Sequence, residues 1–154
     1  LKAFFEMEDF EVVLTRESDM GLYEESDSNK KNADMRNRVS LIGQIAPVLT
    51  ISIHQNSYSD ESIKGAQTFY FSSSKESKNL AGYIQKSLVN TLDKGNRRKV
   101  AANDNYYLLK NITCPIVIIE CGFLSNSKER NLLKTQEYQK KIARAISLGV
   151  LEYF

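Results

Sequence analysis

The stretch Ile116-Val117-Ile118-Ile119-Glu120-Cys121-Gly122-Phe123-Leu124-Ser125-Asn126 decides the fold of this chain. It follows Pro115, which has no backbone N–H and therefore suits the first position of a strand. Four apolar β-forming residues come next, a run typical of a strand buried on both faces. Glu120 ends that run, and a buried carboxylate is costly to ionise without a partner or a metal. The stretch predicts a central strand that ends in a candidate functional carboxylate, with simple pairing to a buried base as the alternative.

The rest of the chain alternates expected strands with expected helices. Short runs of β-branched and aromatic residues predict three more strands, at about Phe10–Thr15, Val48–His54 and Ala66–Phe71. Apolar residues three or four apart predict helices at about Asn32–Ile45, Lys75–Leu92 and Thr135–Tyr153, with the last turns of another in residues 1–8. Ser125 or Asn126 can cap a helix beginning near Lys128, whereas Tyr106–Leu109 fits a short strand or a turn. This order predicts the α/β class, a three-layer sandwich with a mostly parallel sheet flanked by helices.

Composition fits one globular domain. The 154 residues are enough to bury a sizeable core, and 42% apolar with 26% charged residues is ordinary for such a chain. A net charge of +2 gives no strong case for binding nucleic acid or a membrane. Cys114 and Cys121 would lie roughly 23 Å apart on an extended chain, too far for a disulfide. They form no CxxC pair, so a cysteine zinc site is not expected.

His54 is the only histidine, and it also ends a predicted buried strand. Because ligands bind beyond the carboxyl ends of strands in open α/β sheets, His54 and Glu120 are expected at the same edge. A zinc hydrolase needs three protein ligands and a water, and a nearby carboxylate can take the proton from that water. A lone histidine is more often simply packed or hydrogen-bonded, so that alternative stays open. No GxSxG elbow, P-loop or GxGxxG motif supports a serine hydrolase or a nucleotide site.

Several segments in order resemble the zinc-dependent N-acetylmuramoyl-L-alanine amidases of the type 3 family. They are Leu14-Thr15-Arg16 with Asp19, Arg38, Ser52-Ile53-His54-Gln55-Asn56, Gly65–Tyr70 and Glu120–Asn126. Asn103–Leu109 resembles the sporulation and germination-specific branch, which acts on spore cortex. The resemblance covers nearly the whole chain.

The resemblance implies a role for three residues. His54 matches a zinc ligand, Glu120 matches the catalytic glutamate, and Asn56 lies beside the site where it would help orient substrate. It implies zinc as cofactor and peptidoglycan as substrate. We expect no nucleic-acid partner, since the net charge of +2 gives no strong case for one. An activating or anchoring protein is a further partner that the resemblance leaves open. The expected location is extracytoplasmic, in the forespore intermembrane space or the envelope of a spore-forming bacterium.

One departure from the family pattern concerns the metal. The family's other two zinc ligands, a His in a His-Gly-Gly segment and a Glu at the start of the first helix, have no match here. We expect both upstream of Leu1, so residues 1–154 would be an amidase catalytic domain without its N-terminal strand and part of its first helix, inactive alone. The alternatives are a non-catalytic module of the same fold that binds peptidoglycan or a partner and, with less support, a zinc carboxypeptidase.

Overall fold

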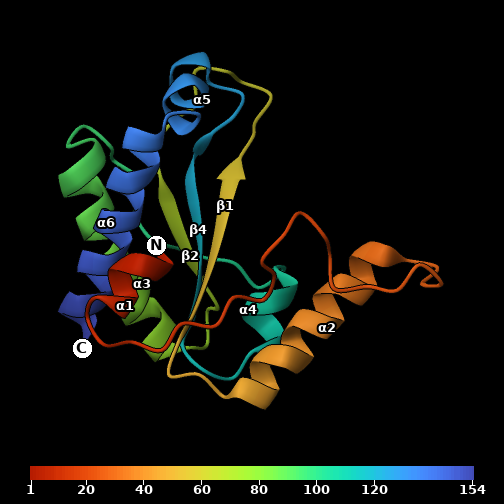
Figure 1. The fold of residues 1–154 in the computed structure, drawn as a ribbon. Helices are drawn as coiled ribbons and strands as arrows, with labels where there is room; N and C mark the ends of the chain where they lie inside the picture. Colours follow the sequence, from red (N-terminus) through yellow and green to blue (C-terminus); the bar gives the residue numbers. More distant parts are fainter.

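The strand predicted at Ile116 lies at the centre of the sheet in the computed structural model, which describes residues 1–154 (Figure 1). This strand, β4 (Ile116–Phe123), is buried along its whole length. The sheet has the order β1-β4-β2-β3, with β1 (Thr50–Asn56), β2 (Gln67–Tyr70) and the short β3 (Ala101–Ala102). β1 is parallel to β4 and β3 to β2, whereas β2 is antiparallel to β4. The sheet is therefore mostly parallel, as predicted.

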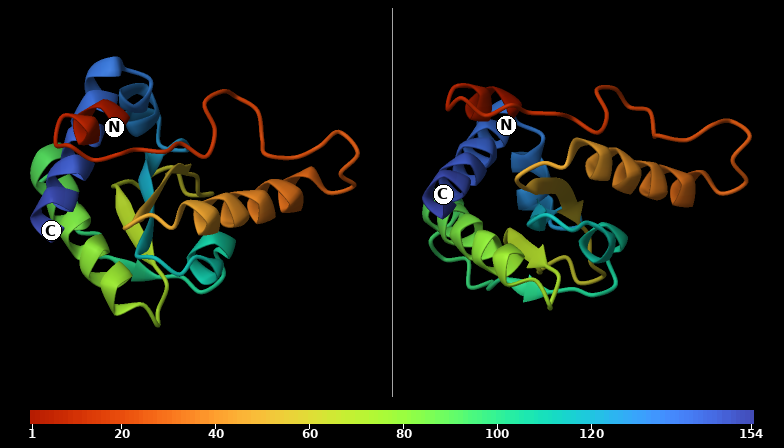
Figure 2. Two further views of the ribbon diagram at one scale, coloured as in Figure 1. Left: turned by 60° about the horizontal axis from the view of Figure 1, so that its bottom comes forward. Right: turned by 90° about the horizontal axis from the view of Figure 1, so that it is seen from below.

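Helices cover both faces of this sheet and complete the three predicted layers (Figure 2). On one face α3 (Lys75–Leu92) and α6 (Gln136–Tyr153) lie against each other, and α1 (Lys2–Glu6) packs on α6. The main core lies there and includes Val117, Ile119 and Cys121 of β4. On the other face α2 (Lys30–Ile45) and α4 (Tyr107–Asn111) cover Ile116 and Ile118. Alternate residues of β4 thus face two different helical layers, which explains its uninterrupted apolar run.

Side-chain caps set the helix boundaries close to the predicted ones. Ser74, Thr135 and Asn29 accept a backbone N–H at the start of α3, α6 and α2. Asn126 does the same for α5 (Ser127–Leu133), so of the two predicted capping residues it is the one used. No helix is long and apolar enough to cross a bilayer.

The strand predicted at Phe10–Thr15 is absent, because this segment pairs with no other strand. Phe10 packs its ring against Phe5 and Phe154, at centroid distances of 5.7 and 5.5 Å. Val13 and Leu14 are exposed. Phe10 and Val12 fix the segment through side-chain packing instead of through a β ladder, and the sequence pattern does not distinguish the two.

The segment Tyr106–Leu109 contributes to a helix, α4, rather than to a strand or an isolated turn. The Asn103 side chain accepts the N–H groups of Asn105 and Tyr106, which bends the chain before the helix begins. Leu108 and Leu109 are then buried against the sheet. A helix this short shows no apolar period, so its hydrophobic residues alone suggest a strand.

Candidate active site

The parallel pairing of β1 and β4 sets His54 directly beside Glu120. Residues paired in this way project from the same face of a sheet, and neighbouring strands are about 4.8 Å apart. The face is that of Ile116 and Ile118, which α2 and α4 cover. The structure therefore confirms the prediction that His54 and Glu120 lie at the same edge of the sheet.

Glu120 is a buried carboxyl without a partner. It is 7% exposed, and its Oε2 atom has no hydrogen bond. No ion pair of the chain includes it, so the alternative of a carboxylate paired with a buried base does not hold. Burial raises the pKa of Glu120 above its usual value. Such a carboxyl can take up and release a proton closer to neutral pH than an exposed glutamate can.

His54 sits at the open side of this pair. Its side chain is exposed, and Nε2 lies 2.8 Å from the Ser52 Oγ atom on the same strand face. Desolvation lowers the pKa of His54, and the positive charges of Arg38 and Arg16 lower it further. The imidazole is thus held in its neutral form at physiological pH, the form that binds metal ions.

Arg38 is fixed beside the site by contacts within α2 and with the segment before it. Its guanidinium donates to Asp34 from Nε and Nη2, at 2.7 and 3.1 Å, and to Thr15 Oγ1 at 3.0 Å. Asp34 also accepts the Leu22 N–H. Arg38, one of the residues that carried the resemblance, thus has a structural role: it ties α2 to the segment before it. It also places a positive charge near His54.

Asn56, the predicted substrate-binding residue, lies two positions beyond His54 and pairs with Phe123. The register shifts between His54 and Asn56, so β4 carries one residue more than β1 at this point. The Asn56 Oδ1 atom accepts the Ser57 N–H, and its carbonyl accepts the Leu124 N–H at 2.7 Å. Asn56 therefore helps fix the chain after the bulge, and its role toward substrate stays a prediction.

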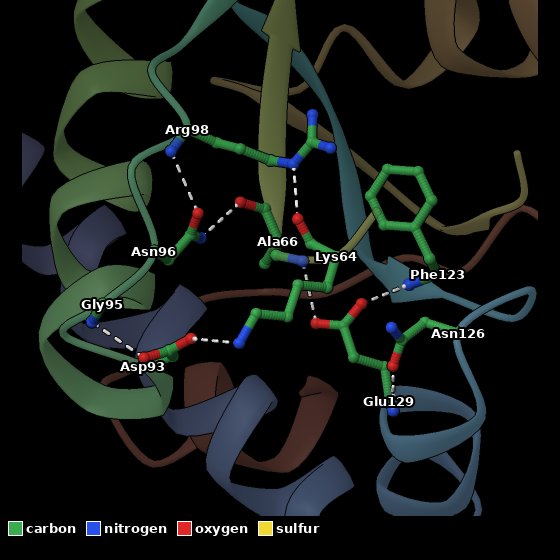
Figure 3. A network of polar contacts seen from close by, with 10 residues as sticks. Lys64, Ala66, Asp93, Gly95, Asn96, Arg98, Phe123, Asn126 and Glu129 are labelled. Atoms are coloured by element: carbon green, nitrogen blue, oxygen red, sulfur yellow. Dashed lines mark hydrogen bonds and ion pairs between the residues drawn. The ribbon is translucent and has the colours of Figure 1, made fainter. Parts of the chain in front are cut away.

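Sequence reasoning missed Glu129, which holds the loops around the bulge. Its Oε1 accepts the Gly65 N–H at 2.9 Å and its Oε2 accepts the Phe123 N–H at 2.8 Å (Figure 3). Asn126 in turn accepts the Glu129 N–H. A capping residue followed three positions later by Glu is a recognised helix-start pattern, and it could have drawn attention to this glutamate.

Gln67 and Arg98 extend the site across the sheet and were also missed. Gln67 on β2 stands opposite Glu120 in the antiparallel pair. Its Oε1 accepts from Arg98 Nη1 at 2.9 Å, and its Nε2 donates to the Lys99 carbonyl. The sequence identified the loop 93–99 only as basic, because no local sequence pattern indicates where the side chains of a loop point.

The segment Asn103–Leu109, which resembled the germination-specific branch, brings Tyr106 near Glu120. Burial raises the pKa of Tyr106, and the negative charge of Glu120 raises it further, so the tyrosine lies within electrostatic reach of that carboxyl. Its ring meets Phe69 edge-on at 5.8 Å. The segment therefore places an aromatic residue near Glu120 on the face covered by α4.

The donors present do not complete a zinc site. No group of three or more His, Cys, Asp and Glu side chains in this chain could hold a metal ion, whereas a catalytic zinc takes three protein ligands. His54 supplies one imidazole, and the free oxygen of Glu120 lies beside it. Cys121 cannot substitute, because burial raises the pKa of its thiol to about 12. Residues 1–154 alone therefore support no catalytic step through a metal.

Comparisons with known proteins agree on one family. A family model described as N-acetylmuramoyl-L-alanine amidase matches residues 1–152. The germination-specific N-acetylmuramoyl-L-alanine amidase of Bacillus subtilis is 41% identical over 146 residues, which are 93% of this chain and 61% of that protein. The LytC amidase of the same species is 30% identical over 84% of this chain and 26% of its own length. This chain thus spans about three fifths of the first relative and about a quarter of the second.

Solved structures give the same result. The CwlD amidase from Clostridioides difficile, solved in complex with the GerS lipoprotein, is 41% identical with a TM-score of 0.96, covering 99% of this chain and 79% of that one. The catalytic domain of CwlV, an amidase from Bacillus (Paenibacillus) polymyxa, is 27% identical with a TM-score of 0.82, covering 99% of this chain and 77% of that one. The α/β sandwich predicted from the sequence is therefore the fold of these enzymes.

Proposed function

Because the chain belongs to the N-acetylmuramoyl-L-alanine amidase family, we propose that the full protein hydrolyses the amide bond between N-acetylmuramic acid and L-alanine in peptidoglycan. The observation that best supports this is the pair formed by His54 and Glu120. A neutral imidazole and a partnerless buried carboxyl with a raised pKa lie side by side on one face of the sheet. This combination suits proton transfer to and from a water that attacks a carbonyl.

Glu120 carries the proton transfers in this proposal. Its carboxylate takes a proton from the attacking water as the new C–O bond forms at the lactyl carbonyl of muramic acid. The carboxyl group then gives that proton to the departing nitrogen of L-alanine as the C–N bond breaks. The products are a free lactyl carboxylate and an intact stem peptide with a new amino terminus. A raised pKa allows one group to serve first as base and then as acid.

Zinc dependence is part of the proposal. In enzymes of this kind the metal supplies Lewis-acid chemistry at the carbonyl oxygen and lowers the pKa of water. His54 would be one ligand, and Asn56 would help to orient the substrate beside it. The remaining ligands, a His and a Glu by the resemblance, would come from residues outside these 154, since the donors present fall short of three.

We propose spore cortex peptidoglycan as the natural substrate and the extracytoplasmic envelope of a spore-forming bacterium as the location. Two observations support this. The segment Asn103–Leu109, which resembles the germination-specific branch, brings Tyr106 near Glu120, and the Bacillus subtilis relative is germination-specific. A partner protein is proposed as well, because the structure of the similar CwlD amidase contains the GerS lipoprotein.

A non-catalytic peptidoglycan-binding module is the second candidate, and the incomplete set of metal donors favours it. One experiment separates the two. Full-length wild-type protein and its Glu120→Gln variant are incubated with cortex and with vegetative sacculi in the presence of zinc, and the released material is separated by chromatography. We expect the wild type to release intact stem peptides, faster from cortex. The variant should be about 10²–10⁴-fold slower because it lacks the general base, with zinc content unchanged by elemental analysis.

Each other outcome of this assay has a clear meaning. A Glu120→Gln variant that works near the wild-type rate would refute the assignment of the general base. Tight binding of sacculi without release of peptides would favour the binding module, and release of single amino acids would favour a carboxypeptidase. Equal rates on the two kinds of sacculi would remove the cortex preference and leave the amidase activity standing.

A further inference from the structure

We propose that Arg98 forms an anion subsite of the candidate active site and binds a free carboxylate on the peptide part of the substrate. The inference rests on the proposed function and adds to it a residue that selects the substrate. Arg98 comes from the loop between α3 and β3, and it has a guanidinium that no carboxylate of the chain neutralises.

The position of Arg98 follows from the register of the sheet. His54 pairs with Glu120, and Glu120 pairs with Gln67. Arg98 Nη1 then donates to the Gln67 side chain at 2.9 Å. The Arg98 guanidinium therefore lies next to the β2 neighbour of Glu120 and over the ring of Phe123, which follows Glu120 by three residues on β4. Three residues of extended strand separate Phe123 from Glu120, so the guanidinium lies about 10 Å from the Glu120 position, which is roughly three residues of extended peptide.

The guanidinium is held in a fixed orientation. Its Nε donates to the Lys64 carbonyl at 2.8 Å, and its Cζ lies 4.7 Å from the centre of the Phe123 ring. Figure 3 shows the side chain reaching from its loop toward Phe123 and away from Asp93. Stacking on an aromatic face and hydrogen bonds to neutral oxygens leave the positive charge in place while removing its freedom to move.

The backbone beneath Arg98 is fixed as well. The Arg98 N–H donates to Asn96 Oδ1, and its carbonyl accepts from Gln85 Nε2 at 3.1 Å. Asn96 donates to the Ala66 carbonyl next to Gln67 (Figure 3), and Gln85 Nε2 donates to the same carbonyl. Gln85 is 5% exposed, so the anchor belongs to the protein interior. The guanidinium is thus preorganised before a ligand arrives, which reduces the entropy lost on binding.

Donors remain on the guanidinium for a ligand. Arginine has five N–H donors, and the contacts above use one at Nε and one at Nη1. No hydrogen bond within the chain uses Nη2. A planar fork with free N–H groups matches a carboxylate, and such charge-assisted bonds are stronger than neutral ones. A stem peptide attached through its first residue carries its free carboxylates on later residues, and a carboxylate about three residues beyond the reacting amide matches the separation of Arg98 from Glu120.

The test compares two soluble muramoyl peptides that differ only in one group, a free carboxylate or its amide on the residues after L-alanine. For the full-length wild-type protein, kcat/KM should be about 10- to 100-fold higher for the acid form, and Arg98→Met should remove this preference through KM. Arg98→Lys should keep part of it, since lysine keeps the charge without the fork. Arg97→Met changes the exposed neighbour in the same loop and should leave the preference intact.

Calorimetric binding of both peptides to the Glu120→Gln protein, with and without Arg98→Met, gives a readout that needs no turnover. Binding that prefers the acid form through Arg98, without hydrolysis by the wild type, would refute the proposed function and leave this inference standing. An equal loss for both peptides in Arg98→Met would show a purely structural role and overturn it. A wild type without preference between the two peptides would overturn it too, whatever the variants do.

Discussion

Desolvation shifts the pKa values of Glu120 and His54 in opposite directions, because it disfavours the charged form of each. It raises the pKa of Glu120 and lowers the pKa of His54, which Arg38 and Arg16 lower further. The fold therefore favours the uncharged form of each side chain more than a free peptide would. That state suits an imidazole that binds a metal, and it suits a carboxyl that passes a proton between a water and a leaving amine.

Asp34 gives a prediction at the same scale. The hydrogen bond from Arg38 lowers the pKa of Asp34 despite its partial burial, and Asp34 also fixes the Leu22 N–H. A lowered pKa means that the ionised form stabilises the fold above the unfolded value of 3.8, and that this contribution is lost as the pH falls through the folded-state pKa. We expect Asp34→Asn to lower the free energy of unfolding by about 1–3 kcal/mol at pH 7.

The measurement is urea denaturation of both proteins between pH 7 and pH 2.5. The difference between them should be constant down to about pH 4 and shrink below it. The matched control is Glu137→Gln, since Glu137 and Lys141 form an exposed pair with the same spacing of four residues. Exposed pairs contribute little, so this change should be nearly neutral. A difference for Asp34→Asn that persists unchanged at acid pH would refute the assigned role of its charge.

At the scale of elements, the contact of α3 with α6 depends on Gly149. A Cβ added at Gly149 would lie 2.6 Å from the Ile84 Cα, and backbone there cannot move aside as a flexible side chain could. We expect Gly149→Ala to lower the free energy of unfolding by about 1–3 kcal/mol, because it forces two packed helices apart. Gly82→Ala in α3 is the control, since nothing lies within 4 Å of its Cβ position.

The control should be neutral or stabilising by up to about 1 kcal/mol, because alanine is the better helix former. The measurement is denaturant unfolding of both variants and the wild type, from which the free energies of unfolding are compared. Equal effects of the two substitutions would mean that helix propensity, not the close approach of α3 and α6, governs both positions.

How far the elements could be predicted depends on where their information lies. β4 and α3 are visible in the sequence because burial on both faces and an apolar period are local patterns. Pairing is not local, so Phe10–Thr15 looked like a strand although its apolar residues pack without a ladder. The short α4 begins through contacts of one side chain, Asn103, and so it shows no period to recognise.

The candidate site follows the same rule at the scale of the whole molecule. The meeting of His54 and Glu120 could be predicted, because two strands that both end in a polar residue meet at the same edge when they are parallel. Gln67 and Arg98 could not, since their place depends on an antiparallel neighbour and on a loop that reaches over Phe123. Local sequence patterns were thus enough to predict that His54 and Glu120 meet. The positions of Gln67 and Arg98 required the strand pairing and the path of the loop in the structure.

The sheet of this molecule has one edge that the chain leaves open, and this leads to the last prediction. β1 pairs only with β4, so the N–H and C=O groups on its outer side have no strand partner, and Ile53 is 46% exposed. An unpaired edge with apolar side chains promotes association. With too few metal donors as well, a polypeptide of only these 154 residues should bind zinc poorly, show no amidase activity and self-associate.

The test is to express residues 1–154 and the full-length protein and to compare their zinc content, sedimentation and release of stem peptides. We expect metal, activity and a monodisperse state to appear together in the longer form, because the same added residues would supply ligands and cover β1. Ile53→Lys in the short form should reduce its self-association without restoring zinc, since charge protects the edge but adds no suitable ligand. Tight, stoichiometric zinc in the short form would show that the ligands are misassigned, and a monomeric short form would show that the β1 edge is protected in another way.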